Sequence, residues 1–191
     1  MHLSVSNGRQ SQWTTEELDW IRSLTHCHQL TEDILICHGT PRSDVADFLE
    51  TIEGSAMRIA RPNEINERIG GETAPIIVCG HSHVPRMMKR HAGQSNEQLL
   101  FNPGSVGLQA YASNEPHYYA IENGSPDARY AILERRNGLW QVDFHAVAYD
   151  FESMAQLAQT RGRDDWARAL RTGYMVILFE GIIQRLNFSF I

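Results

Sequence analysis

The sequence predicts an α/β protein in which one β-sheet packs on another and helices lie outside. Three observations favour this fold class. Short apolar runs at residues 34–37, 76–79 and 99–101 alternate with segments that carry helix-start and helix-stop residues. An Asn-Gly pair at residues 137–138 divides two longer runs, which is typical of a β-hairpin. Two more helical segments follow the hairpin, so the alternation comes first and a pair of helices comes last.

The helices are expected where capping residues precede an amphipathic run. Thr14 and Glu17 form a capping-box pattern before an apolar stripe. Ser43 is suited to cap a second helix, and Pro62 to the first turn of a third. The last two helical segments each begin at an aspartate and are followed by a glycine. We therefore expect helices over residues 15–24, 44–50, 62–70, 150–160 and 164–172.

The three short apolar runs are predicted to be buried strands, and each leads into a loop. His38 follows the first run, His81 and His83 follow the second, and a turn at residues 102–105 follows the third. Ligands of open α/β sheets bind in the crevice beyond the carboxyl ends of the strands, so these loops are expected at one rim. The hairpin strands are expected over residues 129–134 and 139–147.

Composition sets limits on size, compartment and partners. The 191 residues, with a mass of 21.7 kDa, are expected to form one domain over residues 1–173 and an apolar tail over residues 174–191. A formal net charge of −6 argues against binding of nucleic-acid backbones. Three cysteines do not make a disulfide framework, which predicts a cytoplasmic protein. The tail is too short and too charged for a membrane span. We interpret it, in order of preference, as an amphipathic end that packs on the domain, as an exposed apolar tail, or as a weak membrane anchor.

Three of the nine histidines are candidate metal ligands. His81 and His83 are two residues apart, so in an extended segment their side chains would leave the same face, as two ligands around a shared centre require. His38 lies 43 residues earlier, at the end of another predicted strand. Imidazole binds zinc, iron, manganese and nickel alike, so the residues alone leave the identity of the metal open.

The motifs around these histidines resemble those of the calcineurin-like metallophosphoesterases, and most closely their small bacterial phosphodiesterase branch. The resemblance is carried by CHGTP at residues 37–41, GHSHVP at residues 80–85 and NPGSVG at residues 102–107. Gly-His-Ser/Thr-His after an apolar strand is a fairly specific signature, and the order of the three motifs adds to it. The likeness extends over residues 14–173.

This resemblance implies a layered α/β/β/α sandwich with two divalent metal ions (manganese, iron, zinc or nickel) between the sheets. His38 and His81 would ligate one metal, and His83 the other. A water between the metals would attack phosphorus in line, so that a phosphodiester or phosphomonoester of a small molecule is hydrolysed. The turn at residues 102–105 would pack near the site or approach the phosphate without ligating metal. The resemblance defines no substrate-binding residues.

The sequence also departs from the family pattern. The family opens with Asp-x-His, Gly-Asp-x-x-Asp and Gly-Asn-His motifs, which supply most carboxylate ligands and the general acid histidine, and none of them precedes His38. We therefore expect the C-terminal portion of the fold only, N-terminally truncated, with a sheet edge that favours homo-oligomers. The single Asp-x-His, at Asp143 and His145, falls on a predicted hairpin strand and is not expected to form the site.

Alternatives to an enzyme remain open. The chain is also interpreted as a non-catalytic interaction scaffold that retains the phosphoesterase fold, and more weakly as a protein with one structural zinc site. Cys37 and Cys79 beside the histidines are compatible with thiolate ligands, although small buried apolar residues are the commoner role of free cysteine. The basic run at residues 86–91 and the aromatic run at 117–119 are interpreted first as surface and packing residues, and second as substrate contacts.

Overall fold

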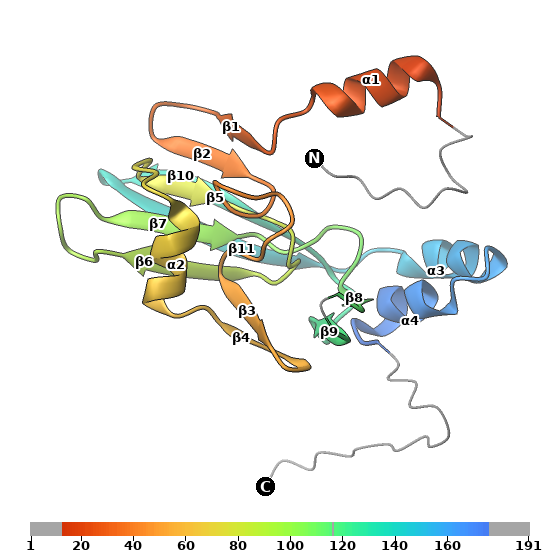
Figure 1. Cartoon of the computed structure of the whole chain (residues 1–191). Helices are drawn as coiled ribbons and strands as arrows, with labels where there is room; N and C mark the ends of the chain where they lie inside the picture. Colours follow the sequence, from red (N-terminus) through yellow and green to blue (C-terminus); the bar gives the residue numbers. More distant parts are fainter. Residues whose placement is uncertain (1–12, 116, 176–191) are drawn as a thin grey trace, which may run out of the picture.

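The central element is a five-stranded mixed sheet. The computed structural model describes residues 13–115 and 117–175, and within them the chain forms four α-helices and eleven β-strands. The three inner strands of the sheet are parallel, and an antiparallel strand closes each edge (Figure 1). In spatial order the strands are β1 (Cys27–Gln29), β2 (Ile34–Cys37), β5 (Ile76–Val78), β7 (Gln98–Asn102) and β6 (Arg86–Arg90).

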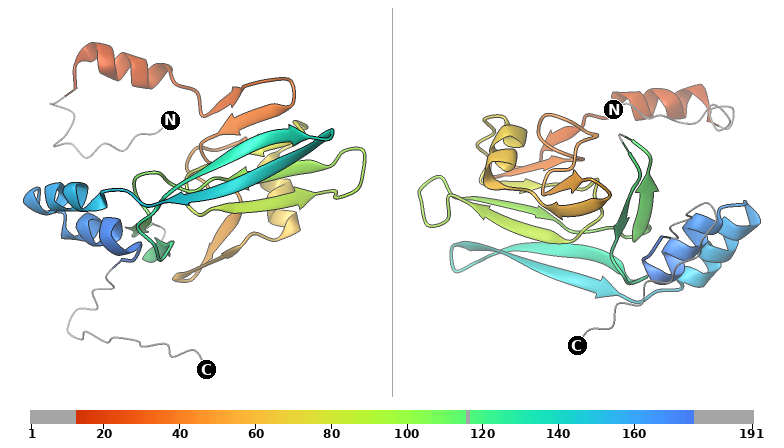
Figure 2. Two further views of the ribbon diagram at one scale, coloured as in Figure 1. Left: turned by 180° about the vertical axis from the view of Figure 1, so that it is seen from behind. Right: turned by 60° about the horizontal axis from the view of Figure 1, so that its bottom comes forward.

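Each face of this sheet is covered by a different layer. Helix α2 (Pro62–Ile69) packs on one face through Ile65 and Ile69, which join the larger apolar cluster. The hairpin of β10 (Ala128–Arg136) and β11 (Leu139–Val147) covers the other face (Figure 2). Its half-buried side chains, such as Trp140, pack on the second apolar cluster. The layered α/β architecture with sheet on sheet is therefore confirmed.

Two short hairpins and two helices lie around the carboxyl end of the parallel strands. Two short hairpins, β3 (Glu50–Glu53) with β4 (Ala56–Ile59) and β8 (Ala110–Ser113) with β9 (Tyr119–Glu122), share a third apolar cluster. Helices α3 (Phe151–Thr160) and α4 (Asp164–Thr172) pack on each other, and α4 also contacts β8 (Figure 1).

Most predicted elements are confirmed to within a few residues. The Asn-Gly turn has positive φ at both positions, 52° at Asn137 and 80° at Gly138, as a tight hairpin turn requires. Helix α1 (Thr15–Ser23) begins with the expected capping box of Thr14 and Glu17. The last two helices were also expected within one residue of their observed bounds. The short strands β1, β3, β4, β8 and β9 were not predicted, because three or four residues carry too little periodicity.

The helix expected over residues 44–50 is wrong. Residues 44–49 form bends and an irregular segment, and Glu50 begins β3. The guanidinium of Arg68 donates hydrogen bonds to the carbonyl oxygens of Phe48 (3.0 Å) and Glu50 (2.7 Å). Phe48 and Leu49 are both fully buried in the larger cluster. Tertiary contacts therefore satisfy this backbone and override the local capping signal.

Helix α1 has few contacts with the body of the protein. All nine of its residues are exposed or half-buried, and Trp20 is 64% exposed. It extends beside the β1 end of the sheet (Figure 1). None of the helices in residues 13–115 and 117–175 has the length and apolar character to cross a bilayer. Of the predicted tail at 174–191, residues 176–191 lie outside the described residues.

The hairpin turn offers a test of the fold. We expect Gly138→Ala to lower the free energy of unfolding by about 1 kcal/mol, because an L side chain is disfavoured at its φ of 80°. The space around a Cβ at this position is open, so the loss reports backbone conformation alone. Urea denaturation of the purified variant measures it.

Gly107→Ala is the matched control for this substitution. Its Cβ also meets open space, but Gly107 does not have a positive φ. We expect no loss of stability, or a small gain from the stiffer unfolded chain. Equal losses in the two variants would contradict the assignment of a left-handed turn at Gly138.

Candidate functional site

The candidate site lies at the carboxyl ends of the three parallel strands. His38 directly follows β2, the loop of residues 80–83 follows β5, and Asn102 is the last residue of β7. The registers of β2 with β5 and of β5 with β7 place these strand ends side by side. The expectation that these loops meet at one rim of the sheet is confirmed.

His38 and His81 form a pair across this rim. Nδ1 of His81 lies 3.3 Å from Nε2 of His38, and the rings meet edge to face with centroids 5.2 Å apart. Two nitrogens that bind one metal ion at about 2.1 Å and at a tetrahedral angle are about 3.4 Å apart. The observed separation fits two ligands of one ion, and it is also the distance of a hydrogen bond in which one ring nitrogen donates to the other.

His83 makes contacts different from those of this pair and is held in one tautomer. Its Nδ1 lies 2.9 Å from the carbonyl oxygen of Leu108, so this nitrogen must carry the proton and donate it. The ring also contacts Tyr111 edge to face, with centroids 5.1 Å apart. Nε2 consequently keeps its lone pair, and a backbone carbonyl behind the opposite nitrogen is the usual arrangement of a metal-binding histidine.

The electrostatics of the site keep two of the imidazoles neutral. Burial lowers the pKa of His81, and the neighbouring His38 lowers it further, whereas Asp44 and a hydrogen bond to the Val45 backbone act in the opposite direction. Burial also lowers the pKa of His83, against the raising effect of its bond to the Leu108 carbonyl. Neutral imidazole is the form that binds metal, so these environments favour ligation.

The loop that carries His81 and His83 is a tight turn rather than an extended segment. The φ angles of His81 and His83 are 64° and 60°, in the left-handed region. The expectation that both side chains leave one strand face is therefore wrong; one ring meets His38 and the other meets Tyr111. Each left-handed residue costs on the order of 1–3 kcal/mol and persists only where surrounding contacts enforce it.

Those surrounding contacts lie beneath the loop. Ser82 is buried between the two histidines, and its Oγ donates a hydrogen bond of 2.8 Å to Oε2 of Glu50. Nδ2 of Asn102 donates to the same Oγ (3.0 Å) and to the carbonyl oxygen of Gly80 (2.7 Å). Nε of Arg86 donates to Oε1 of Glu50 at 2.6 Å. Asn102, the first residue of the turn at 102–105, thus supports the histidine loop, which agrees with the packing role expected for this turn.

The importance of Glu50 was missed in the sequence. Its segment was expected to be helical, where a glutamate is usually solvated, yet the side chain is only 1% exposed. The partners Ser82 and Arg86 lie 32 and 36 residues away. One signal was available in the sequence. Ser82 within the histidine motif and Arg86 just after it can both donate hydrogen bonds to a buried carboxylate.

The other sequence candidates lie elsewhere or have other partners. Cys37 and Cys79 are buried, and burial raises the pKa of the Cys37 thiol to about 12, so thiolate ligands are disfavoured. Asp143 pairs with Arg136 at 3.1 Å and His145 stacks on Tyr130, both on the β10–β11 hairpin. The charged side chains of β6 contact Glu50, Asn66, Glu97 and Gln98.

The donors present fit a dinuclear metal centre only in part. Within residues 13–115 and 117–175, no three His, Cys, Asp or Glu side chains come together as a group that could hold a metal ion. His38 and His81 fit as a pair on one ion, and His83 is prepared for ligation. Oδ1 of Asp47 is buried without a hydrogen-bond partner in the described part of the chain, and burial raises the pKa of that carboxyl. The described residues therefore supply the imidazoles but not a complete ligand set.

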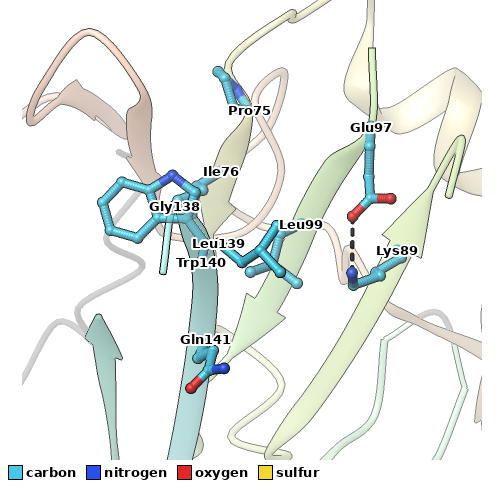
Figure 3. A pocket seen from close by; sticks show the side chains of 9 residues that line it. All are labelled: Pro75, Ile76, Lys89, Glu97, Leu99, Gly138, Leu139, Trp140 and Gln141. Atoms are coloured by element: carbon cyan, nitrogen blue, oxygen red, sulfur yellow. Dashed lines mark hydrogen bonds and ion pairs between the residues drawn. The ribbon is translucent and has the colours of Figure 1, made fainter. Parts of the chain in front are cut away.

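A pocket of about 380 Å³ lies at the opposite end of the sheet. Ile76 and Leu99, near the starts of β5 and β7, line it together with Trp140 of the hairpin (Figure 3). Lys89 on its border already pairs with Glu97 at 2.8 Å. This pocket is separated from the histidines by the length of the strands and does not belong to their site.

Comparisons with known proteins place the chain in a family. A search among curated protein sequences returned no match. The structure is similar to the crystal structure of hypothetical protein PH1004 from Pyrococcus horikoshii OT3, with a TM-score of 0.54 and 16% identity. That match covers 84% of this chain and 56% of PH1004, so the chain spans little more than half the length of that protein.

Vacuolar Protein Sorting 29 from Cryptosporidium parvum also matches, at a TM-score of 0.28 and 16% identity, over 64% of this chain and 56% of that one. The family model for the calcineurin-like phosphoesterase superfamily domain matches residues 12–123, which is more than half of the chain and contains the three histidines and the loops that carry them. The chain belongs to the calcineurin-like phosphoesterase superfamily.

Proposed function

We propose that this protein hydrolyses a phosphoester of a small molecule, with His38 and His81 as ligands of one divalent metal ion and His83 as a ligand of a second. The observation that carries the proposal is the 3.3 Å approach of the His38 and His81 nitrogens at the strand ends. Membership in a family that hydrolyses phosphoester bonds supports the reaction class.

The chain's own residues bind and orient in this proposal. His38 and His81 present nitrogens 3.3 Å apart, and the bond to the Leu108 carbonyl holds His83 in the tautomer whose Nε2 keeps its lone pair. Divalent metals, when bound, lower the pKa of a coordinated water and draw charge from the phosphoryl oxygens. His38 is exposed, so a substrate phosphate has access to this side of the pair. The carboxylate ligands and the general acid are not assigned to residues of this chain.

A non-catalytic interaction scaffold is the second candidate function. The observation that favours it is the incomplete ligand set within residues 13–115 and 117–175. Three neutral imidazoles do not balance the charge of two divalent ions, which weakens metal binding relative to a site with carboxylates. In this case the loops at the strand ends would serve as a binding surface only.

Metal removal tests the proposed function. We expect the purified chain to hydrolyse bis(p-nitrophenyl) phosphate when Mn²⁺ is added, to lose this activity with a chelator, and to regain it when Mn²⁺ is restored. Mass spectrometry under native conditions gives the metal count and the oligomeric state of the same sample. A folded chain that binds no metal and releases no p-nitrophenol at any Mn²⁺ concentration would contradict the proposal and favour the scaffold.

A further inference from the structure

The loop of residues 80–83 has a strained backbone that contacts within the loop do not stabilise. His81 and His83 are both left-handed, a conformation that L residues avoid, and the intervening Ser82 is only 1% exposed. The bond from the Ser82 N–H to the Gly80 carbonyl (2.8 Å) lies within the turn. Contacts from outside the loop must therefore hold its conformation.

Glu50 supplies the central contact. One carboxylate oxygen accepts the Ser82 hydroxyl at 2.8 Å, in the middle of the loop, and the other accepts Nε of Arg86 at 2.6 Å, just after the loop ends. Arg68 of α2 in turn donates to the Glu50 carbonyl at 2.7 Å, which fixes the start of β3. One buried side chain thus ties both the centre and the exit of the histidine loop to a separate hairpin.

We propose that Glu50 is a positioning residue that sets the orientation of His81 and His83 through Ser82. The inference rests on the proposed function for its role in metal binding, but its geometry stands on contacts within the chain. Glu50 lies beneath the loop, not among the facing imidazoles, so it acts through Ser82 rather than as a ligand.

A carboxylate at this position accepts from both neighbours. Arg86 is only a donor, and the Ser82 hydroxyl, which accepts from Asn102 (3.0 Å), gives its single proton to Glu50 (2.8 Å). A glutamine at position 50 offers one acceptor, and Arg86 takes it. Its amide N–H₂ would then face Oγ of Ser82, which can accept one more hydrogen bond, but the hydroxyl proton loses the acceptor that Glu50 provides. We expect this loss to loosen the loop.

The experiment compares histidine ring nitrogens in the metal-free chain by ¹⁵N NMR. In the wild type we expect His83 as the Nδ1-protonated tautomer, because that nitrogen donates to the Leu108 carbonyl. In Glu50→Gln and in Ser82→Ala we expect this pattern to become mixed, and in Ser82→Thr, which keeps the hydroxyl, we expect it to persist. Glu53→Gln is the control, since Glu53 lies on the same strand and binds Arg58 at the surface.

Mn²⁺ affinity gives the second readout. We expect Glu50→Gln and Ser82→Ala each to weaken Mn²⁺ binding by about tenfold or more. Because both act through one contact, we expect the double variant to bind Mn²⁺ as tightly as the single variant with the lower affinity. An unchanged His83 pattern in both single variants would overturn the proposal. If Glu50→Gln does not fold, the Ser82→Ala and Ser82→Thr pair decides. If the variants show the expected NMR changes but the wild type binds no Mn²⁺, the proposed function is refuted and the positioning role of Glu50 still stands.

Discussion

Replacing His81 by alanine is expected to reduce metal-dependent phosphodiester hydrolysis by more than about 100-fold. Substitution of groups that merely orient metal ligands already costs 10–100-fold, and His81 is half of the facing imidazole pair. The fold should persist, because His81 lies in a half-buried loop outside the four apolar clusters. Initial rates with saturating Mn²⁺, together with circular dichroism of the same sample, measure both effects.

His28→Ala is the control for this substitution. His28 is an exposed histidine on the edge strand β1, where it lies opposite Ile36 and outside the two loops that carry the pair. We expect its activity to stay within about twofold of the wild type, since isolated surface changes have small effects. Retained metal-dependent hydrolysis in His81→Ala would refute the assignment of this histidine.

Replacing Arg86 by methionine is expected to lower the free energy of unfolding by about 3 kcal/mol near pH 8. Removing one partner of a buried ion pair leaves an uncompensated charge, here the Glu50 carboxylate, which is 1% exposed. Burial already raises the pKa of Glu50, while Arg86 and Ser82 lower it. Without Arg86 the pKa of this carboxyl rises further in the folded state.

The sign of the pH dependence follows from this shift. A carboxyl whose folded-state pKa lies above its unfolded value destabilises the fold progressively as pH rises through the folded value. The deficit of Arg86→Met relative to the wild type should therefore be small near pH 5 and larger at pH 8, as measured by urea denaturation. Lys89→Met, on the same strand with a surface partner in Glu97, should cost much less and vary little with pH. A pH-independent deficit in Arg86→Met would contradict the burial of an ionised Glu50.

The positions of the histidines could be predicted because the signals were local. Apolar runs before His38 and before the 80–83 loop predicted buried strands, and the rule that ligands bind beyond the carboxyl ends of such strands predicted the rim at which the loops meet. Parallel pairing of β2 with β5 then follows from general rules for such sheets. In the structure His38 contacts His81 and His83 contacts Tyr111, and the division of the three histidines between two metal ions stays a prediction.

The support of the site could not be predicted because it is built by long-range contacts. Ser43 is a good helix cap by itself, but the backbone that follows it binds Arg68 of a later helix. Glu50 becomes buried only because Ser82 and Arg86 arrive from another part of the chain. Local propensity is a weak prior where buried polar partners decide the conformation.

The location of the histidine pair also has a consequence for the order of folding. His38 and His81 are 43 residues apart and stand at the ends of parallel strands, which no tight turn can join. The entropy of closing such a long loop must be overcome before the contacts between the strands compensate for it. The imidazoles therefore meet only after β5 has docked beside β2. A metal ion bound by this pair would slow unfolding of the finished protein, but it would find no paired ligands in early species and would leave the initial collapse unchanged.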